Sequence, residues 1–142
     1  MEDTEKYVDI VYQIIGAAMS VHNELGGGLL EPIYSEALHW ELIDRGIDNE
    51  TEKTLECFYK GRKLDKYYRM DMIVGDIVVE LKATAEIIPE HRFQLFNYLR
   101  LTEKPIGLLL NFGLNNLSGE RYCFDKETNG CFLLDRYMKP ID

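Results

Sequence analysis

Two carboxylates and a lysine, Asp71, Glu80 and Lys82, are the side chains of this sequence best placed to do chemistry. They lie within residues 67–83 (YYRMDMIVGDIVVELKA), where Gly75-Asp76 is a two-residue loop of the kind that β-hairpins favour. If two strands pair about that loop, Asp71 lies directly across from Glu80, with Cβ atoms about 5 Å apart. Two carboxylates this close repel each other unless a positive group lies between them. A bound metal ion with the lysine nearby would stabilise such a pair.

The two strands of this hairpin should have unlike faces, because side chains alternate along a strand. One face carries the three charged residues, and Ile73 and Val78 pair on that same face. The opposite face is wholly apolar and consists of Met70, Met72, Val74, Ile77, Val79 and Leu81. We therefore expect one face to lie on a core and the other to be more than a solvated surface. An exposed face of mixed charge, with Lys82 pairing Glu80, remains the alternative.

Composition predicts a globular protein with a core of ordinary size. The chain has 142 residues, 46% of them hydrophobic, which fits one domain spanning residues 1–142. No apolar run approaches the roughly 20 residues of a membrane span, and the acidic N-terminus lacks the layout of a signal peptide. We therefore expect a cytoplasmic protein without membrane contact. The cysteines, Cys57, Cys123 and Cys131, are odd in number and have no CxxC spacing. Both features argue against a disulfide framework and against a zinc site.

The net charge of −9 argues against tight non-specific binding of nucleic acid by this chain alone. Basic residues gather only at Lys60, Arg62, Lys63 and Lys66, around one predicted turn. An acidic protein can still act on DNA through a local basic rim or a metal ion.

The remaining sequence predicts two N-terminal helices, a mixed sheet with a crossover helix, and a final hairpin. An apolar run at residues 106–112 indicates a strand buried on both faces, and because it follows a helix it suggests a βα crossover. The predicted helices span residues 4–24, 29–45 and 89–102, and the predicted strands lie at 51–59, in the hairpin of 67–83, at 106–112 and at 121–135.

Polar side chains on two of the helices could face the charged strands. Glu31 and Tyr34 are three residues apart near the start of the second helix, so they share a face. An acid at a helix N-terminus also has a purely structural explanation, which stays open. Gln94 and Tyr98 follow His91 along one side of the third helix, where a core helix would carry leucines. The buried stripe of the second helix is expected to be Ile33, Ala37, Leu38 and Leu42.

The order of these motifs resembles the PD-(D/E)XK nuclease superfamily. Asp71 followed by Glu80-x-Lys82 on the next strand is similar to the motif that names the superfamily, although Met70 stands where that name has proline. Gln94-x-x-x-Tyr98 is similar to the QxxxY motif of RecB-like members. Residues 28–34 (GLLEPIY) match the signature of the small GxxExxY family within it. The likeness covers about residues 5–115.

The resemblance implies a fold and a set of site residues. The fold would be α/β, a restriction-endonuclease-like αβββαβ core with a mixed central sheet flanked by helices, plus an extra N-terminal helix and a C-terminal hairpin. Asp71, Glu80 and the Leu81 carbonyl would bind Mg²⁺ or Mn²⁺. Lys82 would orient or stabilise the hydroxide nucleophile, and Glu31 would complete the acidic cluster, directly or through water.

The resemblance also implies a substrate side of the site, made of Gln94, Tyr98, Tyr34 and His91. Gln94 and Tyr98 would contact the nucleic-acid backbone or brace Lys82. Tyr34 would position the helix that carries Glu31, and His91 is a weaker candidate.

Three functions remain open from the sequence. The first is metal-dependent hydrolysis of phosphodiester bonds in DNA. The second is a binding or regulatory module that keeps an idle site and works with a partner protein, which the charge of −9 favours. The third is a structural homodimer, formed through the edge of residues 106–112 or through the terminal hairpin.

Overall fold

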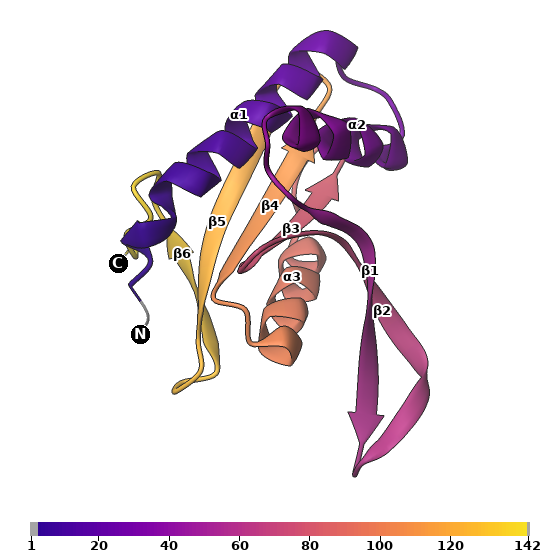
Figure 1. The fold of residues 1–142 in the computed structure, drawn as a ribbon, viewed down its shortest axis with the longest axis vertical. Helices are drawn as coiled ribbons and strands as arrows, with labels where there is room; N and C mark the ends of the chain where they lie inside the picture. Colours follow the sequence, from indigo (N-terminus) through magenta and orange to yellow (C-terminus); the bar gives the residue numbers. More distant parts are fainter. Residues whose placement is uncertain (1–2, 142) are drawn as a thin grey trace.

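A six-stranded mixed sheet with helices on both faces forms the body of the protein (Figure 1). The computed structural model describes residues 3–141. The sheet order follows the chain, from β1 at one edge to β6 at the other. The elements are η1 (Glu5–Tyr7), α1 (Val8–Leu25), α2 (Glu31–Asp44), β1 (Glu50–Tyr59), β2 (Arg62–Val74), β3 (Ile77–Lys82), α3 (Pro89–Thr102), β4 (Ile106–Phe112), β5 (Leu117–Asp125) and β6 (Gly130–Leu134).

The predicted crossover is confirmed, because β3 and β4 pair in parallel and α3 connects them. All other neighbouring strands are antiparallel. Every residue of β4 is buried, as expected for a strand covered on both faces. Because β4 lies between β3 and β5, it offers no free edge, and the predicted dimer contact through that edge is wrong. The C-terminal hairpin, β5 and β6, extends the same sheet beyond β4.

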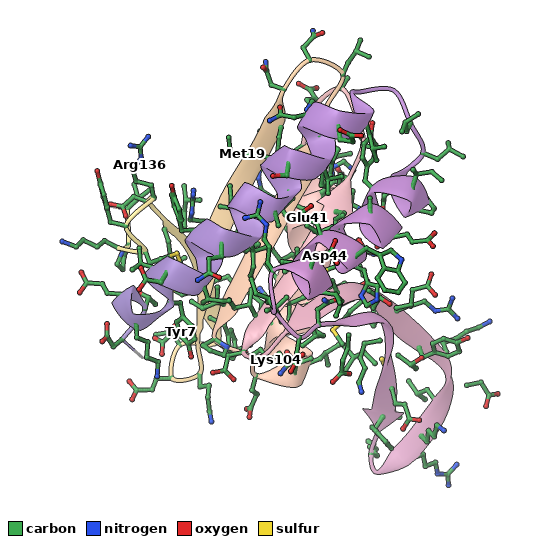
Figure 2. The ribbon with its side chains drawn as sticks, turned by 45° about the horizontal axis from the view of Figure 1, so that its top comes forward. Tyr7, Met19, Glu41, Asp44, Lys104 and Arg136 are labelled. Carbon is green, nitrogen blue, oxygen red and sulfur yellow. The ribbon has the colours of Figure 1, made fainter. Side chains whose placement is uncertain are left out.

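The β2–β3 hairpin has the predicted register, with Met72 opposite Val79 and Val74 opposite Ile77. Two side chains from elsewhere in the chain hold its turn. The Tyr7 hydroxyl donates to Asp76 Oδ2 over 3.0 Å, and Lys104 Nζ donates to the Gly75 carbonyl over 2.9 Å. Tyr7 and Lys104 are labelled in Figure 2. The turn that sets the register is therefore anchored to η1 and to the residues before β4.

Two hydrophobic cores lie on opposite faces of the sheet. The larger core packs α1 and α2 against β2 to β6, and it contains the predicted apolar residues Met72, Val74, Ile77, Val79 and Leu81. The smaller core packs α3 against the other face and contains Ile73 and Val78, which confirms that the charged face is covered.

Two predicted core positions differ from the structure. Met70 was expected beside Met72 but is buried in the smaller core with Ile73. The alternation of faces along β2 breaks between Met72 and Met70, just beyond the last residue at which β2 pairs with β3. Ile33 was expected in the buried stripe of α2 but is 47% exposed, because α2 instead presents Tyr34, Leu38 and Leu42 to the core.

Among the three cysteines, Cys123 lies in the core, and Cys57 and Cys131 are half-buried. Across residues 3–141, no helix combines the length and the hydropathy needed to cross a membrane.

Candidate functional site

The backbone ladder between β2 and β3 opens where the predicted carboxylates begin. The last backbone pair is Met72 with Val79. Beyond it, the Asp71 N–H donates to Glu80 Oε1 over 3.0 Å, and the Leu81 N–H donates to Asp71 Oδ2 over 2.9 Å. The two acidic side chains thus fill the gap between the separating strands, facing each other as the register predicts.

Burial makes this carboxylate pair unusually difficult to ionise. Glu80 is only 2% exposed, and burial together with repulsion from Asp71 raises its pKa to about 8. Burial also raises the pKa of Asp71, although the Leu81 N–H and the Lys82 ammonium both act to lower it. A buried acid and a half-buried acid at one opening in the sheet destabilise the protein when both are charged. A cation between them would relieve that cost.

Lys82 and Gln94 meet beside the carboxylates, as the sequence predicts for strand and helix. Lys82 Nζ donates to Gln94 Oε1 over 3.4 Å, and both side chains are half-buried. Gln94 therefore braces the lysine from α3. His91 lies one turn earlier on α3, where its Nδ1 accepts the Ile88 N–H over 3.2 Å and caps the helix start. Burial and the nearby Lys82 lower the pKa of His91.

Glu31, the first residue of α2, belongs to the helix layer on the other face of the sheet from α3. Its carboxyl group is half-buried, and its pKa is raised first by burial and further by the charge of Asp71, while Lys82 lowers it. Asp71 and Lys82 are thus the charged groups that act on Glu31, although within residues 3–141 Glu31 does not come close enough to Asp71 and Glu80 to form a ready-made cluster of three acids. The charge of Glu31 also contributes to the raised pKa of Glu80.

Tyr34 fixes the start of α2 and does not reach solvent. It is fully buried, and its ring stacks on Phe112 of β4 with centroids 4.7 Å apart. The Tyr34 hydroxyl donates to the Gly26 carbonyl over 2.6 Å and accepts the Leu29 N–H over 3.1 Å. Among the residues expected on the substrate side, Tyr34 is thus placed to position Glu31 and is not placed to touch a ligand.

The glycine-rich loop before α2 is packed against the loop after β4. A Cβ atom at Gly27 would lie 2.1 Å from the Leu114 carbonyl oxygen, so the two backbones approach as closely as only glycine allows. His22, at the end of α1, contacts the same region through Nε2 and the Gly113 carbonyl, 2.7 Å apart. These contacts hold α1, α2 and β4 together behind the site.

Tyr98 is also a buried support. It is 1% exposed, and its hydroxyl donates to the Arg69 carbonyl over 3.4 Å. Its ring lies nearly perpendicular to that of Tyr68, with centroids 5.5 Å apart. Tyr98 therefore holds β2 against α3 two residues before Asp71, and burial is the main cause that raises its own pKa.

Sequence reasoning missed one supporting residue, Asn111. It is 4% exposed and lies opposite Lys82 in the β3–β4 pairing. Its Oδ1 accepts the Thr84 N–H over 3.0 Å, and its Nδ2 donates to the Thr84 carbonyl over 3.1 Å, so it clamps the chain just after Lys82. The sequence feature that could have indicated this role is the single amide side chain in the otherwise apolar run IGLLLNF.

The donor set fits a hard divalent cation better than a zinc-type cage. Within residues 3–141, no three His, Cys, Asp or Glu side chains gather closely enough to form a ready-made metal cluster. The oxygen donors in this region are the carboxylates of Asp71 and Glu80 and the backbone carbonyl of Leu81. Mg²⁺ is commonly held by one or two carboxylates and keeps several waters, so a site of this kind is sufficient for it.

Comparison with known proteins shows the family to which the chain belongs. The sequence matches the family described as the PD-(D/E)XK nuclease superfamily over residues 8–122, which is most of the chain. The chain belongs to the PD-(D/E)XK nuclease superfamily. Membership supports a nuclease-type phosphodiester hydrolase, and nucleases of this superfamily typically use divalent metals.

Among solved structures, the chain is similar in fold to one titled "Crystal structure of SSO0001". The TM-score is 0.54 and the sequence identity is 23%, over 69% of this chain and 52% of that one. The chain therefore matches about half of that structure, and the likeness concerns the fold. The expected restriction-endonuclease-like architecture is confirmed. Comparison with curated proteins finds no match.

Proposed function

We propose that this PD-(D/E)XK superfamily protein is a metal-dependent nuclease that hydrolyses phosphodiester bonds in DNA. The observation that carries the proposal is the opening of the β2–β3 ladder, where Asp71 and Glu80 face each other next to Lys82. A structural acid pair would be expected to have a basic partner at ion-pair distance. Within residues 3–141, neither carboxylate has one at 4 Å or less.

The proposed ligands of a Mg²⁺ or Mn²⁺ ion are Asp71, Glu80 and the Leu81 carbonyl. A bound divalent ion would lower the pKa of a coordinated water and neutralise charge that develops on the phosphate. Lys82, a compact cation held by Gln94, would stabilise the attacking hydroxide and the developing phosphate charge. Glu31 would complete the acidic cluster, directly or through water.

The remaining motif residues support this arrangement. We propose that Gly28 to Tyr34 is the signature segment of the GxxExxY group and that Gln94 and Tyr98 form its QxxxY motif. In this assignment Tyr34 positions Glu31, and Tyr98 fixes β2 beside Asp71. Gln94 and His91 are half-buried, so they remain the candidates for contact with the DNA backbone.

The direct test is cleavage of single-stranded and double-stranded DNA by purified protein with Mg²⁺ or Mn²⁺. Asp71→Asn and Lys82→Ala should each lower the rate by about 100-fold or more, because each removes charge at the reacting phosphate. Asp44→Asn and Lys126→Ala are matched controls, since both residues are exposed and lie outside the site. Equal cleavage by the site variants and wild type would show that the activity comes from a contaminant.

A second candidate, a binding module with an idle site that works with a partner protein, is favoured by the charge of −9. Calorimetric titration with Mn²⁺ separates the two. The nuclease proposal expects Mn²⁺ binding that Glu80→Gln weakens strongly. Binding that is absent, or that this substitution leaves unchanged, would support the idle module.

A further inference from the structure

The outer part of the β1–β2 hairpin, residues 53–69, is a feature that the proposed site does not use. Here the two strands pair only with each other, whereas β2 pairs with β3 through residues 72–74. Figure 1 shows this arm reaching away from the sheet and the helices. Apart from half-buried Leu55 and Cys57, every residue of the arm is exposed. Packing therefore explains little of its side-chain composition.

The charge of the arm is opposite to that of the chain. It holds six basic residues and two acidic ones, a formal charge of +4, so the rest of the chain carries −13. The basic residues are Lys53, Lys60, Arg62, Lys63, Lys66 and Arg69. Lys63 pairs with Glu56 at 3.1 Å and Lys53 with Glu50 at 2.8 Å. Within the described residues, Arg62, Lys66 and Arg69 make no ion pair and are available to an anionic partner.

Aromatic side chains are interleaved with these cations. Phe58, Tyr59 and Tyr67 are 62%, 61% and 56% exposed, and Tyr68 is 39% exposed where it meets Tyr98. The pairing register and the alternation of side chains place Tyr59 and Tyr68 on the face of Arg62 and Lys66. Phe58 and Tyr67 share the other face with Lys63 and Arg69, so each face of the arm carries both rings and cations. Aromatic rings beside a positively charged track are the features that bind single-stranded nucleic acid, because bases stack on the rings while phosphates meet the cations.

The arm leads directly to the carboxylates. Arg69 precedes Asp71 by two residues on the same strand, and the Tyr98 hydroxyl holds the Arg69 carbonyl at 3.4 Å. From Arg62 to Arg69 the strand covers roughly 23 Å at the usual rise per residue. A nucleic-acid strand lying along the arm would therefore continue toward the opening between β2 and β3.

We propose that the arm binds an unpaired segment of the nucleic acid whose phosphodiester reaches the Asp71–Glu80 site. This inference rests on the proposed function, and it deepens it by naming a single strand as the substrate class. The basic side chains alone would bind the phosphates of a duplex as well as those of a single strand. The exposed rings decide between the two, because the bases of a duplex are already stacked on one another and those of a single strand are free to stack on protein.

The test is binding, measured without cleavage. Fluorescence anisotropy in EDTA compares a labelled thymidine oligomer with a duplex of the same length. Tyr59→Ala and Tyr67→Ala should each weaken binding of the oligomer about 5- to 150-fold, the range for loss of one stacked base. Tyr137→Ala is the matched control. It is 61% exposed and adjoins Arg136, which Figure 2 places across the molecule from the arm.

The salt dependence of binding tests the cations separately. The double variant Arg62→Gln/Lys66→Gln should reduce the slope of log affinity against log salt by about 1.4, since each lost phosphate contact contributes about 0.7 for a single strand. Arg136→Gln/Lys126→Gln removes the same charge from exposed positions outside the arm and should leave the slope unchanged.

Several outcomes would overturn the inference while leaving the proposed function intact. They are unchanged binding by the aromatic variants, preference for the duplex, or a dimer in light scattering that the arm variants dissociate. Conversely, arm-dependent binding of the oligomer without metal-dependent cleavage of any DNA would refute the proposed function and leave the arm as a single-strand binding surface that serves no nuclease site.

Discussion

Replacing Glu80 by glutamine should stabilise the metal-free protein, by an amount that grows with pH. Glutamine keeps the shape of the side chain and an oxygen that can accept the Asp71 N–H, but it removes the buried charge. In the folded protein the pKa of Glu80 is raised from 4.5 to about 8, first by burial and then by Asp71. A raised carboxyl pKa gives stability that is fully present below pH 4.5 and is lost as the pH rises through about 8.

The magnitude follows from the same values. One pKa unit corresponds to about 1.4 kcal/mol, so between pH 4.5 and pH 7 the linkage amounts to ~3 kcal/mol. For a chain of this length that is a difference in Tm of about 10 °C. Wild type and Glu80→Gln should therefore melt at similar temperatures near pH 5 and separate progressively toward pH 8.

Thermal melts in EDTA from pH 5 to 8.5, followed by circular dichroism, measure this difference. Adding Mg²⁺ should raise the Tm of wild type far more than that of Glu80→Gln, because the ion neutralises the buried carboxylate pair. A gap between the two proteins that stays constant with pH, or an equal response to Mg²⁺, would refute the reasoning.

Glu120→Gln is the control for this experiment, because its linkage has the opposite sign. The Arg92 guanidinium, which donates two hydrogen bonds of 2.8 Å, holds the pKa of Glu120 below its usual value. A lowered carboxyl pKa gives stability that is present above pH 4.5 and is lost as the pH falls through the folded value. Glu120→Gln should therefore be less stable than wild type at pH 7, approach it at acid pH, and respond to Mg²⁺ as wild type does.

Two further predictions concern the residues that position Glu31. Tyr34→Phe keeps the ring on Phe112 but leaves the Gly26 carbonyl and the Leu29 N–H without their partner. It should lower the free energy of unfolding by about 1–3 kcal/mol in urea titrations and weaken Mn²⁺ binding. Unchanged values of both would show that Tyr34 does not position the site. Gly27→Ala places a methyl group against the Leu114 backbone and should destabilise the protein by about 2 kcal/mol or more. A Tm within experimental error of wild type would contradict the close approach of these loops.

The hairpin that carries the carboxylates could be predicted from sequence because its determinants are local. A two-residue turn sets the register, and the period of two then decides that Asp71 meets Glu80. The bounds of α3 follow in the same way from Pro89 and the apolar spacing after it. These features depend on residues close in the chain, so the sequence is sufficient to place them.

Features that depend on distant packing could not be predicted. Ile33 and Tyr34 are adjacent on α2, and the helical pattern alone did not reveal which of them is buried. Phe112 of β4, far along the chain, decides it by stacking on Tyr34. In the same way, Met70 lies on the α3 side, past the point where β2 separates from β3 and the alternation along β2 breaks. No pattern within β2 indicates where the two strands separate.

The sequence by itself therefore determined the order of elements, the facing carboxylates with their lysine, and the resemblance to the superfamily that the family match confirms. Tertiary structure decided what surrounds them. It opened the ladder beside Asp71 and buried Glu80, and it made Tyr34 and Tyr98 supports that do not face a ligand. It also left the basic and aromatic arm uncovered. The physical reason is that register and charge are local properties of a chain, whereas burial and pKa depend on which distant segments pack against a residue.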